Sequence, residues 1–291
     1  MATISAKTLT RFLAIFNFKK LVELSLRNPS RTNNALVSKR LHKKFQLNEF
    51  QIMDKSVVTL SSKTTISNIH ILFFHGGAYM LEGTSMHWKI IENIVVNANC
   101  KVSYIDYPLA PEYNYKTTFE MVQQCYDKLT IENPNDRFML MGDSAGGGLA
   151  LAFAQKLAID NTAIQPQKLI LFSPWLDMAM ENSEIKKMEN LDKILSVKAL
   201  RDAAQHYSGG DDLHQYLLSP INGKFLGLGQ TLVFYGTSEI LYNDCIKLKE
   251  KTAGLGNFHF QEFAEMQHDW VLFPIAEADK ALEMAVEFIV R

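Results

Sequence analysis

The pentapeptide GDSAG at residues 142–146 constrains the fold of this chain more than any other feature of its sequence. An apolar run, residues 137–141, precedes it, and a helical pattern follows it from Gly147. A strand that turns sharply into a helix strains the residue at the turn, and small neighbours are needed for the backbone to close around that residue. The pattern therefore predicts a strand–turn–helix unit that holds the central serine, Ser144, at the end of its strand.

The same alternation of strand and helix continues on both sides of this unit. Helical patterns occur at residues 88–96, 118–131, 149–159, 242–253 and 275–290. Short apolar runs predict strands covered on both faces at residues 69–74, 101–105, 137–141, 169–172, 231–235 and 258–262. Alternation of this kind predicts an α/β protein with a mostly parallel twisted sheet flanked by helices. Residues 57–60 predict one antiparallel strand ahead of the parallel set.

Composition limits the classes of function. The chain has 291 residues, 47% of them hydrophobic, which is enough for a folded enzyme of one domain. Its formal net charge is −1, so it has no basic field to hold a nucleic acid. The three cysteines, Cys100, Cys125 and Cys245, lack the close spacing of a disulfide framework or a zinc site, and reduced thiols favour a cytoplasmic protein.

Two segments depart from the alternation of strands and helices. Residues 1–50 are helical in pattern and precede the first strand, and residues 178–228 are charged and helix-prone. An insertion at the carboxyl end of a strand is where a lid would lie. We therefore expect an N-terminal cap segment and a cap insertion over a core of residues 51–177 and 229–291. Ordinary packing helices are the alternative interpretation.

The N-terminal segment contains an apolar stretch, residues 11–22, that is interrupted by Asn17, Lys19 and Lys20. A signal peptide needs an unbroken apolar stretch followed by a small-residue cleavage site, and a spanning helix needs about 20 apolar residues. We therefore expect an amphipathic helix and no stable membrane insertion, with the aromatic residues at 12–18 covering a ligand pocket.

The expected insertion is dense in charge over residues 181–193. Burying an unpaired charge is very unfavourable, so these side chains are expected mostly to face water. They are Glu181, Glu184, Lys186, Lys187, Glu189, Asp192 and Lys193.

Ser144 is the candidate nucleophile, because the turn places it above a helix N-terminus whose partial positive charge favours a developing anion. A phosphate-binding turn is the alternative, but that motif would need further glycines in a G-x-G-x-x-G pattern or a lysine after them. A second turn, HGGA at residues 75–78, follows another predicted strand. The N–H groups of Gly76, Gly77 and Ala145 are therefore predicted to hold an oxyanion. His75 is interpreted as a brace for this loop.

These motifs resemble the hormone-sensitive lipase family of bacterial esterases, in the branch with an acidic residue before the nucleophile. Pro108 is a departure, since the family usually has arginine at this position. The resemblance spans roughly residues 70 to 270 in family order. It is carried by HGGAY at 75–79, DYPLAPE at 106–112, GDSAGG at 142–147, SPWLD at 173–177 and the segment 236–244.

The resemblance implies the α/β-hydrolase fold with a helical cap, ester hydrolysis through an acyl-enzyme, and no cofactor or metal. The chain order of that fold is serine, acid, histidine. His268 follows the last predicted strand, where the fold needs its base. Glu239 and Asp244 both follow the 231–235 strand, and the family pattern places the acid at Glu239. Asp143, beside the serine, is expected to be structural.

The expected function is hydrolysis of a small-molecule carboxylic ester, with a preference for short acyl chains. Tyr79 is a candidate pocket residue, with plain packing as the alternative. Two other functions stay open: an amidase or peptidase with the same triad, and a ligand-binding protein on an inactive hydrolase fold. These folds often pair through an exposed edge, which leaves a homodimer open.

Overall fold

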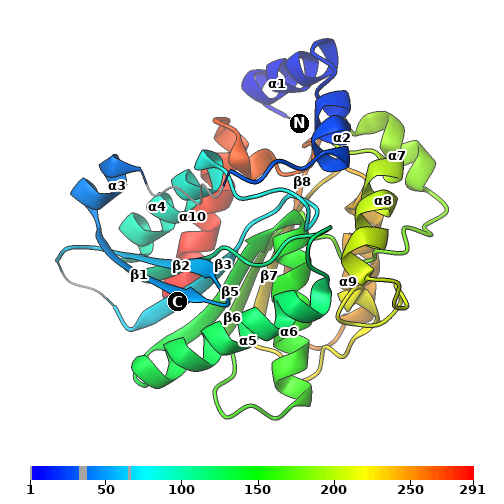
Figure 1. Ribbon diagram of the computed structural model, residues 1–291. Coiled ribbons are helices and arrows are strands. Elements are labelled where there is room, and N and C mark those ends of the chain that lie inside the picture. The colour runs from blue at the N-terminus through cyan, green and yellow to red at the C-terminus, as the bar shows by residue number, and fades with distance from the viewer. Residues whose placement is uncertain (1, 33–37, 65–66) are drawn as a thin grey trace.

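The computed structural model describes residues 2–32, 38–64 and 67–291, and in these residues eight strands form one twisted sheet (Figure 1). The strand order is β1-β2-β4-β3-β5-β6-β7-β8. The strands from β3 to β8 run parallel, and β2 is antiparallel to both β1 and β4. The predicted α/β fold is therefore confirmed. The strands are β1 Gln46–Ile52, β2 Lys55–Ser61, β3 Ile69–Phe74, β4 Lys101–Ile105, β5 Arg137–Asp143, β6 Lys168–Phe172, β7 Gln230–Gly236 and β8 Phe258–Phe263.

Alternate side chains of the central strands enter two separate cores. In β3, Leu72 and Phe74 join one apolar cluster, whereas Ile71 and Phe73 join the other. Because successive side chains of a strand point to opposite faces, an unbroken apolar run is what a strand covered on both faces needs. This is why the run at residues 69–74 predicted its strand correctly.

Helices cover both faces of the sheet. One core contains the apolar sides of α4 and α10, and the other contains those of α5, α6, α8 and α9. The helices of the two layers are α4 Ser85–Ala98, α5 Tyr115–Glu132, α6 Ser144–Ile159, α8 Val197–Ser208, α9 Tyr242–Lys251 and α10 Ala276–Val290.

The edge strand β1 was not predicted, and the predicted boundary at residue 50 falls inside it. Its sequence QLNEFQI is mostly polar, and only Ile52 is fully buried. An edge strand with one neighbour gains its stability from pairing with β2 rather than from burial, so its sequence carries little apolar signal.

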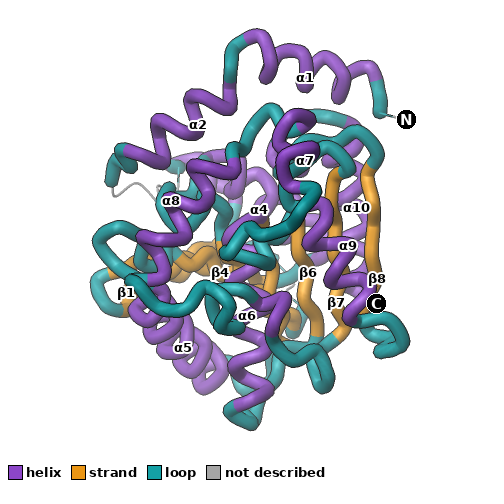
Figure 2. Tube along the Cα trace, turned by 90° about the vertical axis from the view of Figure 1, so that its right-hand side faces the viewer, coloured by secondary structure: helices purple, strands orange, loops and turns teal. Residues whose placement is uncertain are grey.

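In the N-terminal segment α3 leads into the edge strand β1, whereas α1 and α2, like α7 of the 178–228 insertion, lie beyond the carboxyl end of the sheet (Figures 1 and 2). The two segments meet where the Lys19 ammonium of α2 donates to the Glu189 carbonyl of α7 at 2.7 Å. Arg31 ties the N-terminal segment to the core by donating to the carbonyls of Met80 and Ala110, at 2.5 and 2.6 Å. The helices of these segments, besides α8, are α1 Ile4–Ile15, α2 Phe18–Arg27, α3 Lys39–Lys44 and α7 Ile185–Leu191.

Candidate active site

Ser144 occupies the predicted turn between β5 and α6, with a backbone φ of 51°. Gly142 and Gly146, on either side of Ser144, are required because other backbone atoms come very close to them. A Cβ on Gly146 would overlap the carbonyl groups of Phe74 and His75, and a Cβ on Gly142 would overlap the carbonyl of Gly146. Backbone atoms cannot move aside as a side chain can, so the turn accepts only glycine at both positions. The GDSAG pattern is thus a packing requirement that holds the Ser144 hydroxyl at the end of the sheet.

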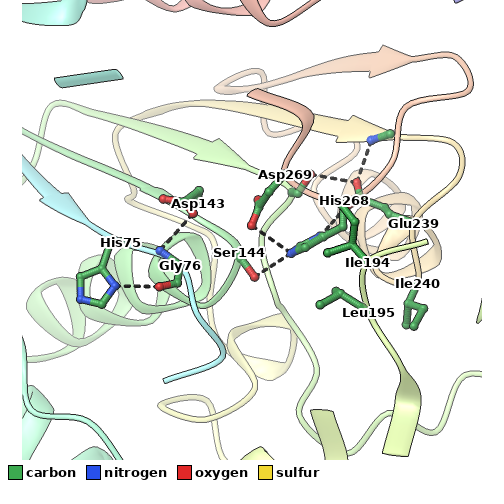
Figure 3. A network of polar contacts seen from close by, with 12 residues as sticks. His75, Gly76, Asp143, Ser144, Ile194, Leu195, Glu239, Ile240, His268 and Asp269 are labelled. Carbon is green, nitrogen blue, oxygen red and sulfur yellow. Dashed lines mark hydrogen bonds and ion pairs between the residues drawn. The ribbon is translucent and has the colours of Figure 1, made fainter. Parts of the chain in front are cut away.

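A chain of hydrogen bonds connects Ser144 to two other predicted residues (Figure 3). His268 Nε2 lies 2.8 Å from Ser144 Oγ, and His268 Nδ1 lies 2.7 Å from Glu239 Oε2. The other oxygen of Glu239 accepts from the N–H of Gly236 at 2.7 Å and from the Ser173 hydroxyl at 3.1 Å. Because a carboxylate only accepts, the contact with Glu239 keeps a proton on Nδ1, and Nε2 faces the Ser144 hydroxyl, whose proton it can accept when the ring is neutral.

The second candidate acid, Asp244, lies elsewhere. It is buried on α9, where burial first and the Asp177 carboxylate second raise its pKa to about 8. Burial also raises the pKa of Glu239, although the hydrogen bond and charge of His268 oppose that shift, so contact with the imidazole rather than pKa distinguishes the two acids. Of the two candidates, Glu239 is the one that contacts His268.

Asp269 is a site residue that the sequence analysis missed. Its Oδ2 lies 3.1 Å from His268 Nε2, the nitrogen that also faces Ser144. Asp269 has a left-handed backbone conformation, with φ of 50°, where its side chain approaches the ring of the preceding residue. The sequence offered only an aspartate beside a loop histidine, and nothing in it indicated that conformation.

Two carboxylates therefore flank one imidazole, on opposite ring nitrogens. Burial alone would lower the pKa of His268, but the charges and hydrogen bonds of Asp269 and Glu239 outweigh burial and raise this pKa well above its usual value. Burial in turn raises the pKa of Asp269 to about 6. The neutral ring that can act as a base therefore needs a higher pH than an ordinary histidine does.

The N–H of Gly76, in the loop after β3, was predicted to hold an oxyanion, and the structure gives it another partner. This N–H donates to Asp143 Oδ2 at 3.0 Å instead of facing a ligand (Figure 3). The same oxygen lies 3.2 Å from His87 Nε2, and His87 Nδ1 accepts the N–H of Thr84 at 2.8 Å. Asp143 thus holds the 75–78 loop against the serine turn and does not contact His268 Nδ1.

His75 supports this loop through a hydrogen bond and ring stacking. Its Nδ1 donates to the Gly76 carbonyl at 2.7 Å, and its ring stacks on Tyr107 with 4.5 Å between centroids. Burial lowers the pKa of His75 to about 4, so the ring is neutral at pH 7. The Tyr107 hydroxyl also donates to the His75 carbonyl at 2.6 Å.

A cavity of about 170 Å³ opens above Ser144. Apolar side chains from the N-terminal segment and from the insertion form its walls. Tyr79 does not line it: its ring stacks on Tyr207 with 3.9 Å between centroids, so Tyr79 is a packing residue and its expected place in the pocket is wrong. The lining residues include Phe18, Val22, Leu26, Gly77, Ala78, Ile194, Leu195, Leu272 and Phe273.

Asp192 connects the insertion to the site, contrary to the expectation that its charge faces water. It is buried, and its Oδ1 accepts the N–H groups of Ile194 and Leu195 at 2.7 and 2.8 Å. Its Oδ2 accepts the N–H of Ile240, the residue after Glu239, at 2.9 Å. One carboxylate thus fixes both a cavity wall and the segment that carries Glu239.

In the part of the chain that the structure describes, no three His, Cys, Asp or Glu side chains gather closely enough to hold a metal ion. No described helix is long and apolar enough to cross a membrane.

We expect Asp269→Asn to lower the pKa of His268, because the negative charge beside Nε2 favours the protonated ring and the amide removes that charge. An NMR pH titration of the histidine rings, assigned with His268→Gln, measures this shift. Asp279→Asn, on the exposed side of α10, is the control and leaves the titration unchanged. An identical His268 titration in Asp269→Asn and the unaltered protein would contradict the electrostatic role given to Asp269.

Known proteins share this architecture. A family model described as alpha/beta hydrolase fold matches residues 71–272. An esterase from Acinetobacter venetianus is 31% identical over 225 residues, which cover 75% of this chain and 73% of that protein. An acetyl-hydrolase from Streptomyces hygroscopicus is 30% identical, with 75% and 74% covered.

A solved structure of a putative esterase from Staphylococcus aureus superimposes with a TM-score of 0.81 at 28% identity, covering 95% of this chain and 92% of that one. The fold match extends to an esterase of the bacterial hormone-sensitive lipase family, with a TM-score of 0.84 at 23% identity over 100% of this chain and 99% of that one. The chain therefore belongs to the α/β-hydrolase fold family, among its esterases and acetyl-hydrolases, as its resemblance to the hormone-sensitive lipase family predicts.

Proposed function

We propose that the protein is a carboxylic-ester hydrolase that works through a Ser144–His268–Glu239 triad and an acyl-enzyme. The single observation that carries this proposal is the continuous hydrogen-bond chain from Glu239 through His268 to the Ser144 hydroxyl, buried at the floor of an apolar cavity. A serine hydroxyl is a weak nucleophile unless a base stands ready to take its proton, and this chain supplies that base.

In the first half of the reaction, Ser144 Oγ attacks the ester carbonyl while its proton passes to His268 Nε2. Collapse of the tetrahedral intermediate breaks the bond to the alcohol, which leaves with the proton that His268 returns. In the second half, water attacks the acyl-enzyme, gives its proton to His268, and the acid leaves as Ser144 regains a proton. Glu239 keeps Nδ1 protonated and stabilises the imidazolium in both halves.

The oxyanion of each intermediate needs N–H donors that are not already bonded. Gly76 is excluded from this role by its hydrogen bond to Asp143. We therefore assign the role to Gly77, which the sequence predicted, to Ala78, the next residue along the loop, and to Ala145 at the start of α6. Gly77 and Ala78 line the cavity, which supports this assignment. Preorganised donors of this kind are typically worth about 10²–10³ each in rate.

A cap over the site is the proposed role of the N-terminal segment and the 178–228 insertion. Phe18, Val22 and Leu26 of α2 and the insertion residues Ile194 and Leu195 close the apolar cavity around Ser144. A volume of only about 170 Å³ supports a preference for short acyl chains.

The two alternative functions, an inactive ligand-binding protein and an amidase, can each be distinguished from an esterase. An inactive, ligand-binding hydrolase would not need a base in contact with the serine, and His268 makes that contact. An amidase would use the same triad, so comparing turnover of a p-nitrophenyl ester with that of the matching anilide decides between ester and amide.

Ser144→Ala is expected to leave folding intact and to reduce ester turnover by roughly 10⁴–10⁶, because the attacking atom is removed. Initial rates on p-nitrophenyl acetate, with the melting temperature as the folding check, measure this loss. Near-normal kcat in a verified Ser144→Ala preparation is incompatible with the proposal.

Glu239→Gln is expected to lower kcat severely with little change in melting temperature, since the amide keeps the shape but removes the charge that stabilises the imidazolium. Asp244→Asn is the matched control, a buried acid-to-amide change away from His268, and is expected to be mild. Steady-state kinetics on both variants test the assignment, and the reverse ranking would transfer the role to Asp244.

Turnover is expected to fall as the acyl chain lengthens, because α2 and the insertion close the cavity. The measurement compares kcat/KM for p-nitrophenyl acetate, butyrate, octanoate and palmitate. A maximum at palmitate would refute the short-chain proposal without affecting the triad.

A further inference from the structure

The outward side of α1 is apolar, although it faces solvent. Ala6 and Leu13 are buried on the inner side of this helix, whereas Ile4, Phe12 and Ile15 are exposed by 86%, 51% and 78%. Positions separated by eight and eleven residues lie on one side of an α-helix, so these three form a stripe. Phe16 extends it, with its ring centroid 4.4 Å from that of Phe12. The expectation that the aromatics of 12–18 cover the ligand pocket thus holds for Phe18 alone.

The next helix, α2, has two different apolar sides. Phe18, Val22 and Leu26 line the cavity above Ser144, while Leu21 and Leu24 are exposed. The described residues contain fifteen exposed large apolar side chains, and six of them lie between residues 4 and 24. Apolar exposure concentrated in this way marks an interaction surface, whereas scattered apolar residues need no explanation.

Basic residues accompany this apolar surface. Residues 1–44 contain ten lysines and arginines and one acidic residue, Glu23, so the other 247 residues carry 20 basic and 30 acidic side chains. Part of this basic excess belongs to α3, where Arg40 and Lys44 pair with Glu92. Helix α3 lies away from α1 (Figure 1). On α1 and α2, four basic side chains are exposed: Lys7, Arg11, Lys20 and Arg27. Lys7 and Lys20 lie 4.0 and 3.0 Å from the carboxylates of Glu265 and Glu23, so the four retain a net positive charge of about two.

We propose that this N-terminal face docks reversibly on an anionic lipid surface. The face consists of the ten side chains Ile4, Lys7, Arg11, Phe12, Ile15, Phe16, Lys20, Leu21, Leu24 and Arg27. An amphipathic helix with large apolar residues and flanking cations lies in the plane of a lipid–water interface, where apolar burial and attraction to anionic headgroups both contribute. The two helices lie at one end of the molecule, outside its body, so they can reach a flat surface (Figure 2).

Charge favours lipid over a second copy of the chain. A twofold dimer through this face would bring the same four cations of each copy together, and like charges repel. An anionic bilayer instead complements them. Docking in this orientation places a single helix, α2, between the lipid and the cavity that contains Ser144.

The test is co-sedimentation with vesicles of phosphatidylcholine alone and of phosphatidylcholine mixed with phosphatidylglycerol. The unaltered protein is expected to bind the mixed vesicles more tightly than the neutral ones, and salt is expected to weaken this binding by screening. Arg11→Glu/Lys20→Glu removes attraction to the anionic headgroups, and Phe12→Ser/Ile15→Ser removes apolar burial. Each variant is expected to weaken binding to the mixed vesicles at least about tenfold.

Matched controls carry the same changes elsewhere. Lys224→Glu/Lys249→Glu alters the net charge equally, and Ile131→Ser/Leu226→Ser removes side chains that are 77% and 81% exposed on other parts of the surface. Both controls should bind like the unaltered protein. Equal loss of binding in the controls and the N-terminal variants would overturn the proposal, as would failure of the unaltered protein to bind the mixed vesicles.

Two further measurements separate this proposal from its rivals. Ser144→Ala protein should bind vesicles normally, and the N-terminal variants should keep their turnover of soluble p-nitrophenyl acetate, so docking and catalysis can fail independently. Sedimentation velocity tests the dimer: a dimer that Phe12→Ser/Ile15→Ser converts to monomer, without vesicle binding by the unaltered protein, would make this face a protein interface.

Discussion

The site depends on one steric constraint, the contact between the serine turn and the loop after β3. Gly146 lies against the carbonyls of Phe74 and His75 so closely that no side chain fits between them. This contact fixes the distance between the nucleophile turn and the oxyanion loop, and the hydrogen bond from Gly76 to Asp143 fixes their relative orientation. Donors held in advance need no reorganisation when charge develops, which is the main advantage of a preformed site.

The charges around His268 bear on two requirements of the proposed base. A base must be unprotonated to accept the serine proton, yet the imidazolium that then forms must be stabilised. In the proposed triad, Glu239 meets the second requirement through its hydrogen bond with Nδ1, which also fixes the tautomer. Asp269 approaches the reacting nitrogen itself, which stabilises the imidazolium further and makes the neutral ring harder to reach at low pH. The proposed mechanism therefore requires a pH high enough to leave His268 neutral in spite of its raised pKa.

Sequence reasoning predicted the features that local pattern controls. Buried strands such as β3 follow from apolar runs, and the turn at Ser144 follows from its glycines, because both requirements act over a few residues. The features that the sequence did not predict depend on tertiary geometry. Strand β1 is held by its pairing with β2, and Asp269 reaches His268 from a left-handed backbone conformation. Asp192 is buried because it accepts N–H groups from two distant segments. No short pattern in a single sequence carries those relations.

The two sides of α2 explain how a small acyl cavity and a large interaction surface can coexist. Phe18, Val22 and Leu26 line the cavity that contains Ser144, whereas Leu21 and Leu24 are exposed. Substitutions at residues that do not share contacts usually act independently. The proposed chain-length preference and the proposed docking are therefore assigned to different side chains of this segment. A protein bound at a lipid surface through the outer side would meet amphiphilic esters at high local concentration while still accepting only their short acyl groups.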